Sequence, residues 1–315
     1  MSSKNKALSS IIICVIIWGF SFISTKITVQ VFPPMSLGLL RFAVALIVMF
    51  IIKIKFAPGE KLRVRDIPLL SAAGLTGVTL YFFFENNGVF LVSASEASIA
   101  ISSIPALIMI ADFISGKIAR NAHGRERADG APAADGTSAA GGTHAAGVRQ
   151  WFGCFISIAG VWLVAGVSFA VSGSILGYVY MTGAALSWVA YSLLTRPLFK
   201  NCSRIYIVFW QTAAGFICFI PFSIHEIPLW GKADAQVIIH LLFLGILCSA
   251  VGYWLYARAM ENLGVSGCGI FLNLVPVITA IAGFFMLGDR LSSLQILGAA
   301  LVISGVYLAI WKKKT

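Results

Sequence analysis

The sequence predicts an all-α integral membrane protein with ten transmembrane helices, arranged as two inverted repeats of five. Two observations lead to this fold class. The chain of 315 residues is 59% hydrophobic and 11% charged, and its mean hydropathy is +0.91, whereas soluble domains carry roughly 25% charged residues. The second half of the chain also repeats polar and aromatic residues of the first half. Together these features indicate a duplicated set of membrane-spanning helices.

The internal repeat keeps a nearly constant spacing over most of its length. Trp18, Ser21 and Thr25 have counterparts 170 residues later, and Ser95, Ser98, Ser102 and Pro105 have counterparts 171 residues later. In the same order, these counterparts are Trp188, Tyr191 and Thr195, then Ser266, Gly269, Asn273 and Pro276. Near the end of each half the spacing falls to 145 residues, where Gly153 and Gly160 match Gly298 and Gly305. The first half therefore contains an insertion.

Ten apolar runs account for the predicted helices, since a helix needs about 20 apolar residues to cross a bilayer. They lie at residues 7–28, 35–55, 67–87, 93–115, 150–170, 175–195, 206–224, 236–257, 265–286 and 292–311. The first run follows a basic start, as in a signal peptide, but no small-residue cleavage site comes after it, so we expect a retained helix. The polar residues Glu85–Asn87 and Ser93–Glu96 divide the third run from the fourth. The first repeat is assigned to residues 1–172 and the second to residues 173–315.

The distribution of basic residues predicts the topology. In a ten-helix arrangement, 19 of the 23 lysines and arginines fall on one side of the membrane. Lys26, Lys232 and Arg290 fall on the other side, and Arg41 lies within a helix. By the positive-inside rule, both termini are expected in the cytoplasm, in an inner (plasma) membrane. Because each repeat has an odd number of helices, the second must be inverted. The net charge of +11 is thus mainly a topology signal, and no nucleic-acid partner is expected.

Residues 118–149 interrupt the apolar pattern with a run rich in Gly, Ala, Ser and Thr. Such a segment buries too little apolar surface to offset the entropy lost on ordering. We expect a disordered cytoplasmic loop that is either a tolerated insertion or a regulatory segment using His123 and His144. The six cysteines and four histidines of the whole chain show no metal-ligand spacing, so neither a metal nor another cofactor is expected.

Polar residues recur at helical spacing on the predicted fourth and ninth helices. Ser98, Ser102 and Pro105 form one face of the fourth helix, and Asn273 and Pro276 repeat it on the ninth. Each proline removes the donor to the carbonyl four residues earlier, which membranes tolerate where protein or a watery cavity covers it. These stripes either line a substrate cavity or allow close packing of helices.

Aromatic and polar residues form similar stripes on the predicted first and sixth helices. Trp18 and Ser21 correspond there to Trp188 and Tyr191. Aromatic residues in membrane proteins commonly anchor at the interface or pack in the core. Both tryptophans lie inside their spans, however, so a place in the cavity lining is an equal alternative.

Charged residues inside the spans are the sharpest candidates. Arg41 costs about 2.5–3.5 kcal/mol to insert at a helix centre, and such residues usually face the protein interior. It could bind a substrate carboxylate through its bidentate fork, or it could form a structural ion pair. Its repeat counterpart is Gln211. Glu85 and Glu96 could bind a substrate amine, relay protons, pair with Arg41, or cap and hydrate an outer loop.

Several of these residues resemble one known family. They are the Trp18–Phe22 pattern, Pro34 to Phe42, Phe84–Asn86, the Ser93–Ser98 stretch that leads to Pro105, and the Gly298 to Gly305 run. In order and spacing they resemble the EamA-type drug/metabolite transporters. The resemblance implies ten helices in two inverted repeats, a central cavity, and movement of small metabolites such as amino acids. Relatives often carry Gly-Glu after the fourth helix, where this chain has Gly116-Lys117.

The resulting functional prediction is a secondary transporter, expected to be an exporter, that carries a small metabolite by alternating access. The sequence contains no GxxxxGK[ST] motif, so a proton gradient or the substrate gradient would drive transport. An intramembrane enzyme is disfavoured because no Ser/His/Asp set or HExxH motif lies within the spans. A membrane scaffold or a channel without coupled transport is the alternative.

Overall fold

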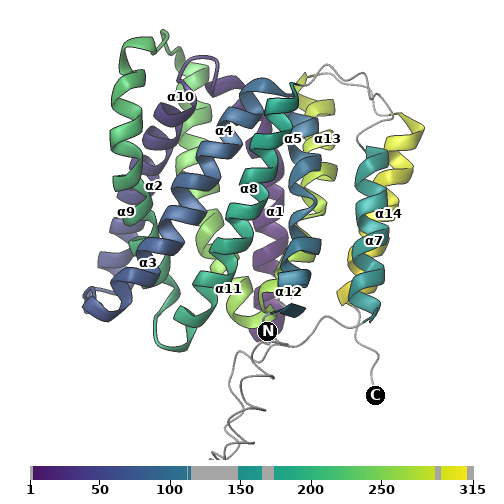
Figure 1. Ribbon diagram of the computed structural model, residues 1–315, viewed down its shortest axis with the longest axis horizontal. Coiled ribbons are helices and arrows are strands. Elements are labelled where there is room, and N and C mark those ends of the chain that lie inside the picture. The colour runs from purple at the N-terminus through teal and green to yellow at the C-terminus, as the bar shows by residue number, and fades with distance from the viewer. Residues whose placement is uncertain (1–2, 112, 115–147, 165–173, 288–291, 311–315) are drawn as a thin grey trace, which may run out of the picture.

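The computed structural model describes residues 3–111, 113–114, 148–164, 174–287 and 292–310, and all regular structure in these ranges is helical (Figure 1). The all-helical prediction is confirmed for this part of the chain. Residues 118–147 of the predicted insertion lie outside it, and Val148 and Arg149 begin a helix.

The elements of the first half follow one another as long or segmented helices. They are α1 (Ser3–Thr28), α2 (Pro34–Phe56), η1 (Val64–Asp66), α3 (Ile67–Gly74), η2 (Leu75–Leu80), α4 (Tyr81–Leu91), α5 (Ala94–Ile101), a helical stretch at 104–111, and α7 (Val148–Val164). Those of the second half are α8 (Ile175–Thr195), η3 (Arg196–Lys200), α9 (Arg204–Ser223), η4 (Ile224–Leu229), α10 (Ala235–Leu242), η5 (Phe243–Val251), α11 (Gly252–Leu263), α12 (Val265–Phe271), α13 (Leu274–Leu287) and α14 (Ser293–Ile310).

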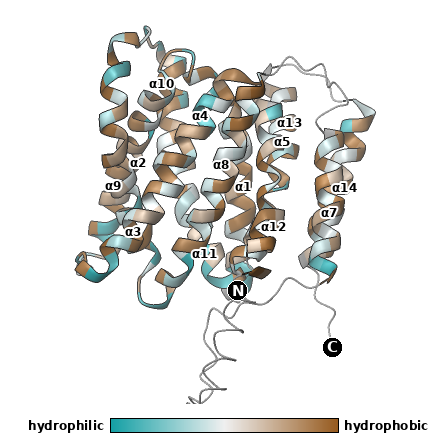
Figure 2. Ribbon diagram, viewed as in Figure 1, coloured by the Kyte–Doolittle hydropathy of each residue, from teal (hydrophilic) through white to brown (hydrophobic). Residues whose placement is uncertain are grey.

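Six helical segments within the described ranges are long and apolar enough to cross a membrane. They are Lys4–Thr28, Pro34–Phe56, Val64–Leu91, Arg204–Leu229, Ala235–Leu263 and Val265–Met286. Two shorter apolar helices, Val148–Leu163 and Ser293–Ala309, lie side by side at one edge of the bundle as parts of α7 and α14 (Figure 1). Hydrophilic residues gather at the two ends of the bundle (Figure 2). These helices are those of a multi-pass membrane protein.

Side chains satisfy several helix ends that would otherwise leave backbone groups unpaired. Lys26 donates from Nζ to the carbonyl oxygens of Val89 and Val92 at 2.7 and 2.8 Å, which closes the C-terminus of α4. The Glu226 carboxylate accepts from the backbone N–H of Ser36 at 2.7 Å, near the N-terminus of α2. These contacts fix the outer ends of neighbouring helices to one another.

Two π-helical turns interrupt two of the long spans. One is η2, between α3 and α4, and the other is η5, between α10 and α11. Gly77 in η2 and Cys248 in η5 are 171 residues apart, which is the spacing of the sequence repeat. The helix breaks lie within one residue of this spacing, because α5 ends at Ile101 and α12 ends 170 residues later at Phe271, each shortly before a proline.

The prolines at these breaks have a smaller effect on the backbone than the sequence suggests. Pro276 cannot donate to the carbonyl of Leu272, which was therefore expected to be free. That carbonyl instead accepts from the N–H of Val275 at 3.0 Å. A local 3₁₀-type bond of this kind is one way in which a membrane helix re-satisfies a freed carbonyl.

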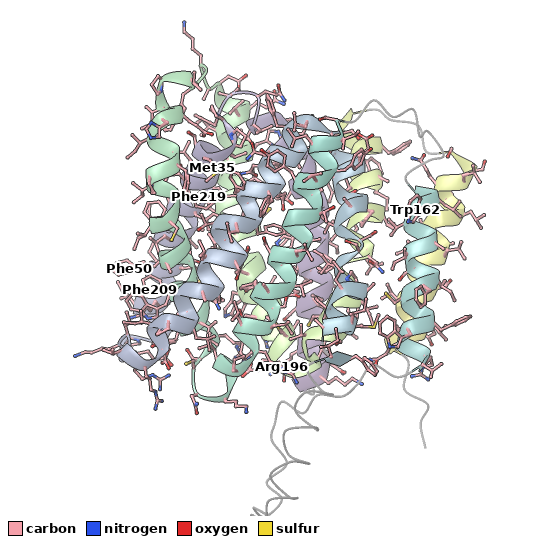
Figure 3. All side chains as sticks on the ribbon, viewed as in Figure 1. Met35, Phe50, Trp162, Arg196, Phe209 and Phe219 are labelled. Carbon is pink, nitrogen blue, oxygen red and sulfur yellow. The ribbon has the colours of Figure 1, made fainter. Side chains whose placement is uncertain are left out.

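Helices from the two halves pack directly against each other. Glycines bring α7 and α14 together: a Cβ on Gly153 would lie 2.5 Å from the carbonyl oxygen of Gly305, and one on Gly160 would lie 2.7 Å from that of Gly298. Aromatic side chains also connect α2 with α9, where the rings of Phe50 and Phe209 are 6.2 Å apart (Figure 3). In lipid, where the hydrophobic effect does not drive helices together, close packing at small residues such as these glycines is a main source of helix association.

Candidate functional site

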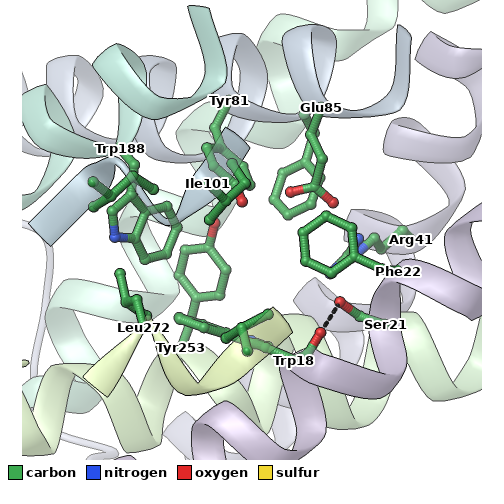
Figure 4. Close-up of a pocket in the computed structure, with 13 residues that line it drawn as sticks. Trp18, Ser21, Phe22, Arg41, Tyr81, Glu85, Ile101, Trp188, Tyr253 and Leu272 are labelled. Carbon is green, nitrogen blue, oxygen red and sulfur yellow. Dashed lines mark hydrogen bonds between the residues drawn. The ribbon is translucent and has the colours of Figure 1, made fainter. Parts of the chain in front are cut away.

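A small cavity lined mainly by buried residues lies where α1, α2, α4, α5, α8, α11 and α13 meet (Figure 4). It is lined by Trp18, Ser21, Phe22, Arg41, Tyr81, Phe82, Glu85, Ile101, Ile104, Trp188, Tyr253, Leu272 and Val275. Its volume for the centres of water-sized molecules is about 30 Å³, and roughly 10–15 Å³ suffices for one water. The space inside the cavity is therefore too small for a metabolite.

Arg41 brings a cation to this cavity. Its side chain is only 2% exposed, and its Nε donates to Ser249 Oγ at 2.6 Å. The guanidinium carbon lies 4.2 Å from the centre of the Phe82 ring, which is within cation–π distance. The Nη1 atom is buried and has no hydrogen-bond partner among the described residues. Arg41 is thus held at one edge and retains donor capacity toward a bound group.

Glu85 brings a carboxyl group to the same cavity. It is 3% exposed and lies near the Tyr81 hydroxyl. Its carboxylate points toward the side of the cavity where Arg41 lies (Figure 4). Within the described part of the chain, Arg41 and Glu85 interact electrostatically but form no direct ion pair. A guanidinium group and a carboxyl group therefore face the same cavity without a direct ion pair between them.

The rest of the wall is mainly aromatic. The rings of Trp18 and Trp188 meet edge to face with centroids 5.2 Å apart, and Tyr253 lies 5.7 Å from Trp188. Their polar atoms are directed into the protein: Trp18 Nε1 donates to the carbonyl of Cys248, and the Tyr253 hydroxyl donates to the carbonyl of Gly77. The cavity therefore presents ring surfaces, and its charges come from Arg41 and Glu85.

Other residues predicted for the site lie outside this cavity. Ser98 and Ser102 are buried on the helix that includes α5, while the adjacent apolar residues Ile101 and Ile104 line the cavity instead. Asn273 is fully buried and donates from Nδ2 to Ser157 Oγ of α7 at 2.7 Å. Pro105 and Pro276 are buried, and the Pro105 Cα would lie 3.6 Å from a Cβ on Gly269. The role of this polar stripe in lining a path stays a prediction.

Glu96, Tyr191 and Gln211 are also placed away from the cavity lining. Glu96 accepts from the backbone N–H of Ser93 at 2.8 Å and from the Tyr178 hydroxyl at 3.0 Å, as a helix-capping residue does. The Tyr191 ring packs 5.0 Å from that of Trp188. Gln211 donates to Thr195 Oγ1 at 2.9 Å. Ser21, which does line the cavity, donates to the carbonyl of Trp18 at 2.7 Å.

Comparison with known proteins identifies the family. The model of the EamA-like transporter family matches residues 5–118 and 175–311. The chain belongs to this family. The resemblance seen in the sequence is confirmed, because the two matched segments together cover most of the chain.

Curated relatives of this EamA chain match it over nearly their whole length. An Archaeoglobus fulgidus protein named "Uncharacterized transporter" is 26% identical over 94% of this chain and 95% of its own. A Streptantibioticus cattleyicolor protein named "Probable terminal-alkyne amino-acid exporter" is 24% identical over 96% of this chain and 93% of its own. An Escherichia coli K12 protein named "Probable amino-acid metabolite efflux pump" is 24% identical over 99% and 98%. This EamA protein is accordingly a membrane transporter.

A solved crystal structure supports the same fold. It superposes with a TM-score of 0.71 over 98% of each chain, at 18% sequence identity. At this identity the similarity concerns the fold alone.

Sequence reasoning missed several residues that line the EamA cavity. Among them are Phe22, Tyr81, Phe82, Tyr253, Ile101, Ile104, Leu272 and Val275. The repeat contained a signal for some of them, because Phe82 and Tyr253 are 171 residues apart, as are Ile101 and Leu272. Apolar and aromatic residues were passed over because they are abundant throughout this chain. No group of three or more His, Cys, Asp or Glu that could hold a metal is present among the residues that the structure describes.

Proposed function

We propose that this EamA-family protein is a secondary transporter that exports amino acids or closely related metabolites across the inner membrane by alternating access. The names of two relatives, an amino-acid exporter and an amino-acid metabolite efflux pump, support both the substrate class and the direction. The small volume of the cavity, about 30 Å³, supports a carrier over an open channel, since an open channel needs a continuous path wide enough for its solute.

The proposed architecture is ten transmembrane helices in two inverted five-helix repeats, at residues 1–172 and 173–315. Three observations support it. The π-helical turns η2 and η5 lie at repeat-equivalent positions, the breaks before Pro105 and Pro276 do so as well, and the family model matches once in each half. With both termini in the cytoplasm, the two halves can rock around the cavity between them.

The observation that carries the substrate assignment is the pair of opposite charges in one aromatic cavity. We assign the substrate carboxylate to Arg41, whose unpartnered Nη1 atom completes a donor fork. The substrate ammonium is assigned to Glu85, and the substrate side chain to the surfaces of Trp18, Trp188 and Tyr253. A zwitterion satisfies both charges at once, which a neutral or singly charged solute cannot do.

The decisive experiment removes the bidentate hydrogen-bonding geometry of Arg41 and keeps its positive charge. In proteoliposomes, Arg41→Lys should weaken the apparent affinity for amino acids about 10- to 100-fold, because a charge-assisted hydrogen bond contributes about 1.5–3 kcal/mol. Protein abundance should stay near normal. Lys53→Gln is the matched control, since Lys53 is a second cation on α2 that lies over an aromatic ring, 5.6 Å from the centre of Phe209. Unchanged affinity in Arg41→Lys, with abundance equal to the control, would reject the assignment.

We further propose that protons are the coupling ion and that Glu85 carries them. A buried carboxylate that faces both the substrate and Arg41 can gain or lose a proton as the substrate binds. Glu85→Gln should therefore abolish transport driven by a pH gradient, whereas exchange of substrate across the membrane should persist with a weakened apparent affinity, because the substrate ammonium loses its carboxylate partner. Glu96→Gln is the control, because Glu96 lies outside the cavity. Equal pH-driven transport in both variants would remove the proton role from Glu85.

A further inference from the structure

Each π-helical turn leaves one carbonyl without its normal helical donor. In an α-helix the N–H of Tyr81 would bond to the carbonyl of Gly77, but in η2 it donates to the carbonyls of Thr76 and Val78. In η5 the N–H of Gly252 donates to the carbonyl of Leu247 and so passes over that of Cys248. The bypassed carbonyls, Gly77 and Cys248, are repeat equivalents. In a lipid environment each would cost several kcal/mol if it stayed unpaired.

Side chains from the opposite half of the protein supply the missing donors. Tyr253, on α11 of the second half, donates from its hydroxyl to the carbonyl of Gly77 in the first half. Trp18, on α1 of the first half, donates from Nε1 to the carbonyl of Cys248 in the second half at 3.0 Å. Both donors line the cavity, and their rings are 6.1 Å apart. The two bonds therefore cross between the halves at the cavity wall.

We propose that Trp18 and Tyr253 are positioning residues that keep the cavity small by bonding to the bypassed carbonyls of the opposite half. A solute larger than a few waters fits the present volume only if lining side chains move, and the Trp18 and Tyr253 rings are part of that lining. Moving the rings breaks the two bonds and releases η2 and η5, which lie midway along their helices. Occupancy of the cavity is thereby linked to bending of one helix in each half. This link between cavity occupancy and helix bending rests on the proposed function in one respect: the solute that occupies the cavity is the transported substrate.

The hydrogen bond of Trp18 requires a small residue at position 252, which is Gly252. A Cβ at Gly252 would lie 2.6 Å from Nε1 of Trp18, so any larger residue would push the indole away from the Cys248 carbonyl. A substitution at Gly252 can thus break the bond without altering the tryptophan itself. By contrast, Tyr256 lies on the same helix and its hydroxyl accepts from Trp188 Nε1 at 3.4 Å, with no bond to either bypassed carbonyl. Tyr256→Phe is therefore the matched control for Tyr253→Phe.

Amide hydrogen exchange in the purified, membrane-reconstituted protein tests the proposal without any substrate. Loss of one buried hydrogen bond, about 1 kcal/mol, corresponds to about a fivefold change in a local opening equilibrium. Tyr253→Phe should raise exchange about fivefold in the segment containing η2 and leave η5 unchanged. Gly252→Ala should do the reverse. Tyr256→Phe should change neither.

Thiol labelling gives a second readout at the cavity itself. Ser21→Cys, in a background without the native cysteines, should react about fivefold faster with a small water-soluble thiol reagent when combined with Tyr253→Phe. The Tyr256→Phe combination should react at the parent rate. Uniform loosening of both turns in every variant, or equal labelling in all of them, would overturn the proposal. Because neither readout uses a substrate, failure here is distinguishable from failure of the proposed amino-acid export.

Discussion

Asn273 provides a direct test of whether the polar stripe on α12 and α13 lines a path or holds helices together. Its amide is fully buried, and Nδ2 donates to Ser157 Oγ at 2.7 Å, while Oδ1 has no partner among the described residues. Ser157→Ala would leave the whole amide unpaired in an apolar interior. A buried polar group in that condition costs about 1–3 kcal/mol, so we expect a loss of stability in this range.

Replacing the amide as well should recover most of that loss. Asn273→Leu has a similar volume and removes both the donor and the unpartnered oxygen, and Ser157 keeps its bond to the Cys154 carbonyl at 3.0 Å. We therefore expect Asn273→Leu, alone or with Ser157→Ala, to unfold within about 1 kcal/mol of the parent. Ser10→Ala serves as the control, since the Ser10 hydroxyl bonds to a carbonyl of its own helix at 2.8 Å.

The measurement is unfolding of the purified protein in mixed micelles by increasing SDS, with transport assayed on the same samples. If Ser157→Ala is as stable as Ser10→Ala, the hydrogen-bond argument fails. If Asn273→Leu is stable but inactive, Asn273 contacts the substrate in another conformation and the packing explanation is wrong. If the Asn273→Leu protein is stable and transports normally, the polar stripe holds helices together and does not line the path.

Four further outcomes are expected. A reporter fused at Lys61 should report the cytoplasm and one near Asp234 the outside, since an opposite result would contradict the inverted repeat. Replacing residues 120–146 with a short Gly/Ser linker should leave transport intact, as measured by uptake at matched abundance. Gly153→Leu should destabilise the protein by at least about 1–3 kcal/mol in the SDS assay, because its Cβ would lie 2.5 Å from a facing carbonyl. Glu96→Gln should retain substrate binding, as measured by isothermal calorimetry, because Glu96 caps α5. Loss of binding in this variant would show that Glu96 belongs to the substrate site.

The sequence predicted the helical fold well because the length of apolar runs and the position of basic loops are determined directly by the bilayer. The run predicted at 175–195 coincides with α8, and the one at 206–224 differs from α9 by two residues at most. The π-helical turns were not predicted, since Leu75–Leu80 contains no proline or other local signal. They depend on donors from the opposite half, such as Tyr253, which only the tertiary structure brings near.

Prediction of the candidate site was less complete. Arg41, Glu85, Trp18 and Trp188 do meet at one cavity, because a charge or an indole inside a span stands out against an apolar background. For the polar stripe, helical periodicity left two alternatives, a substrate cavity or close packing of helices. Periodicity identifies which residues share a face, but it does not say which neighbour that face meets. In the structure, Asn273 meets α7.

The pairing of α7 with α14 has a consequence for biosynthesis. The glycine face of α7 packs on α14, and α14 is synthesised after all the other described helices. During translation, Gly153 and Gly160 of α7 therefore lack their packing partners on α14 until the second half has been inserted. A chain that stops before Ser293 would expose this close-packing surface to lipid and to other nascent chains. Quality-control proteases could recognise α7 in that state, so completion of the chain, rather than of each half, would protect the protein from degradation.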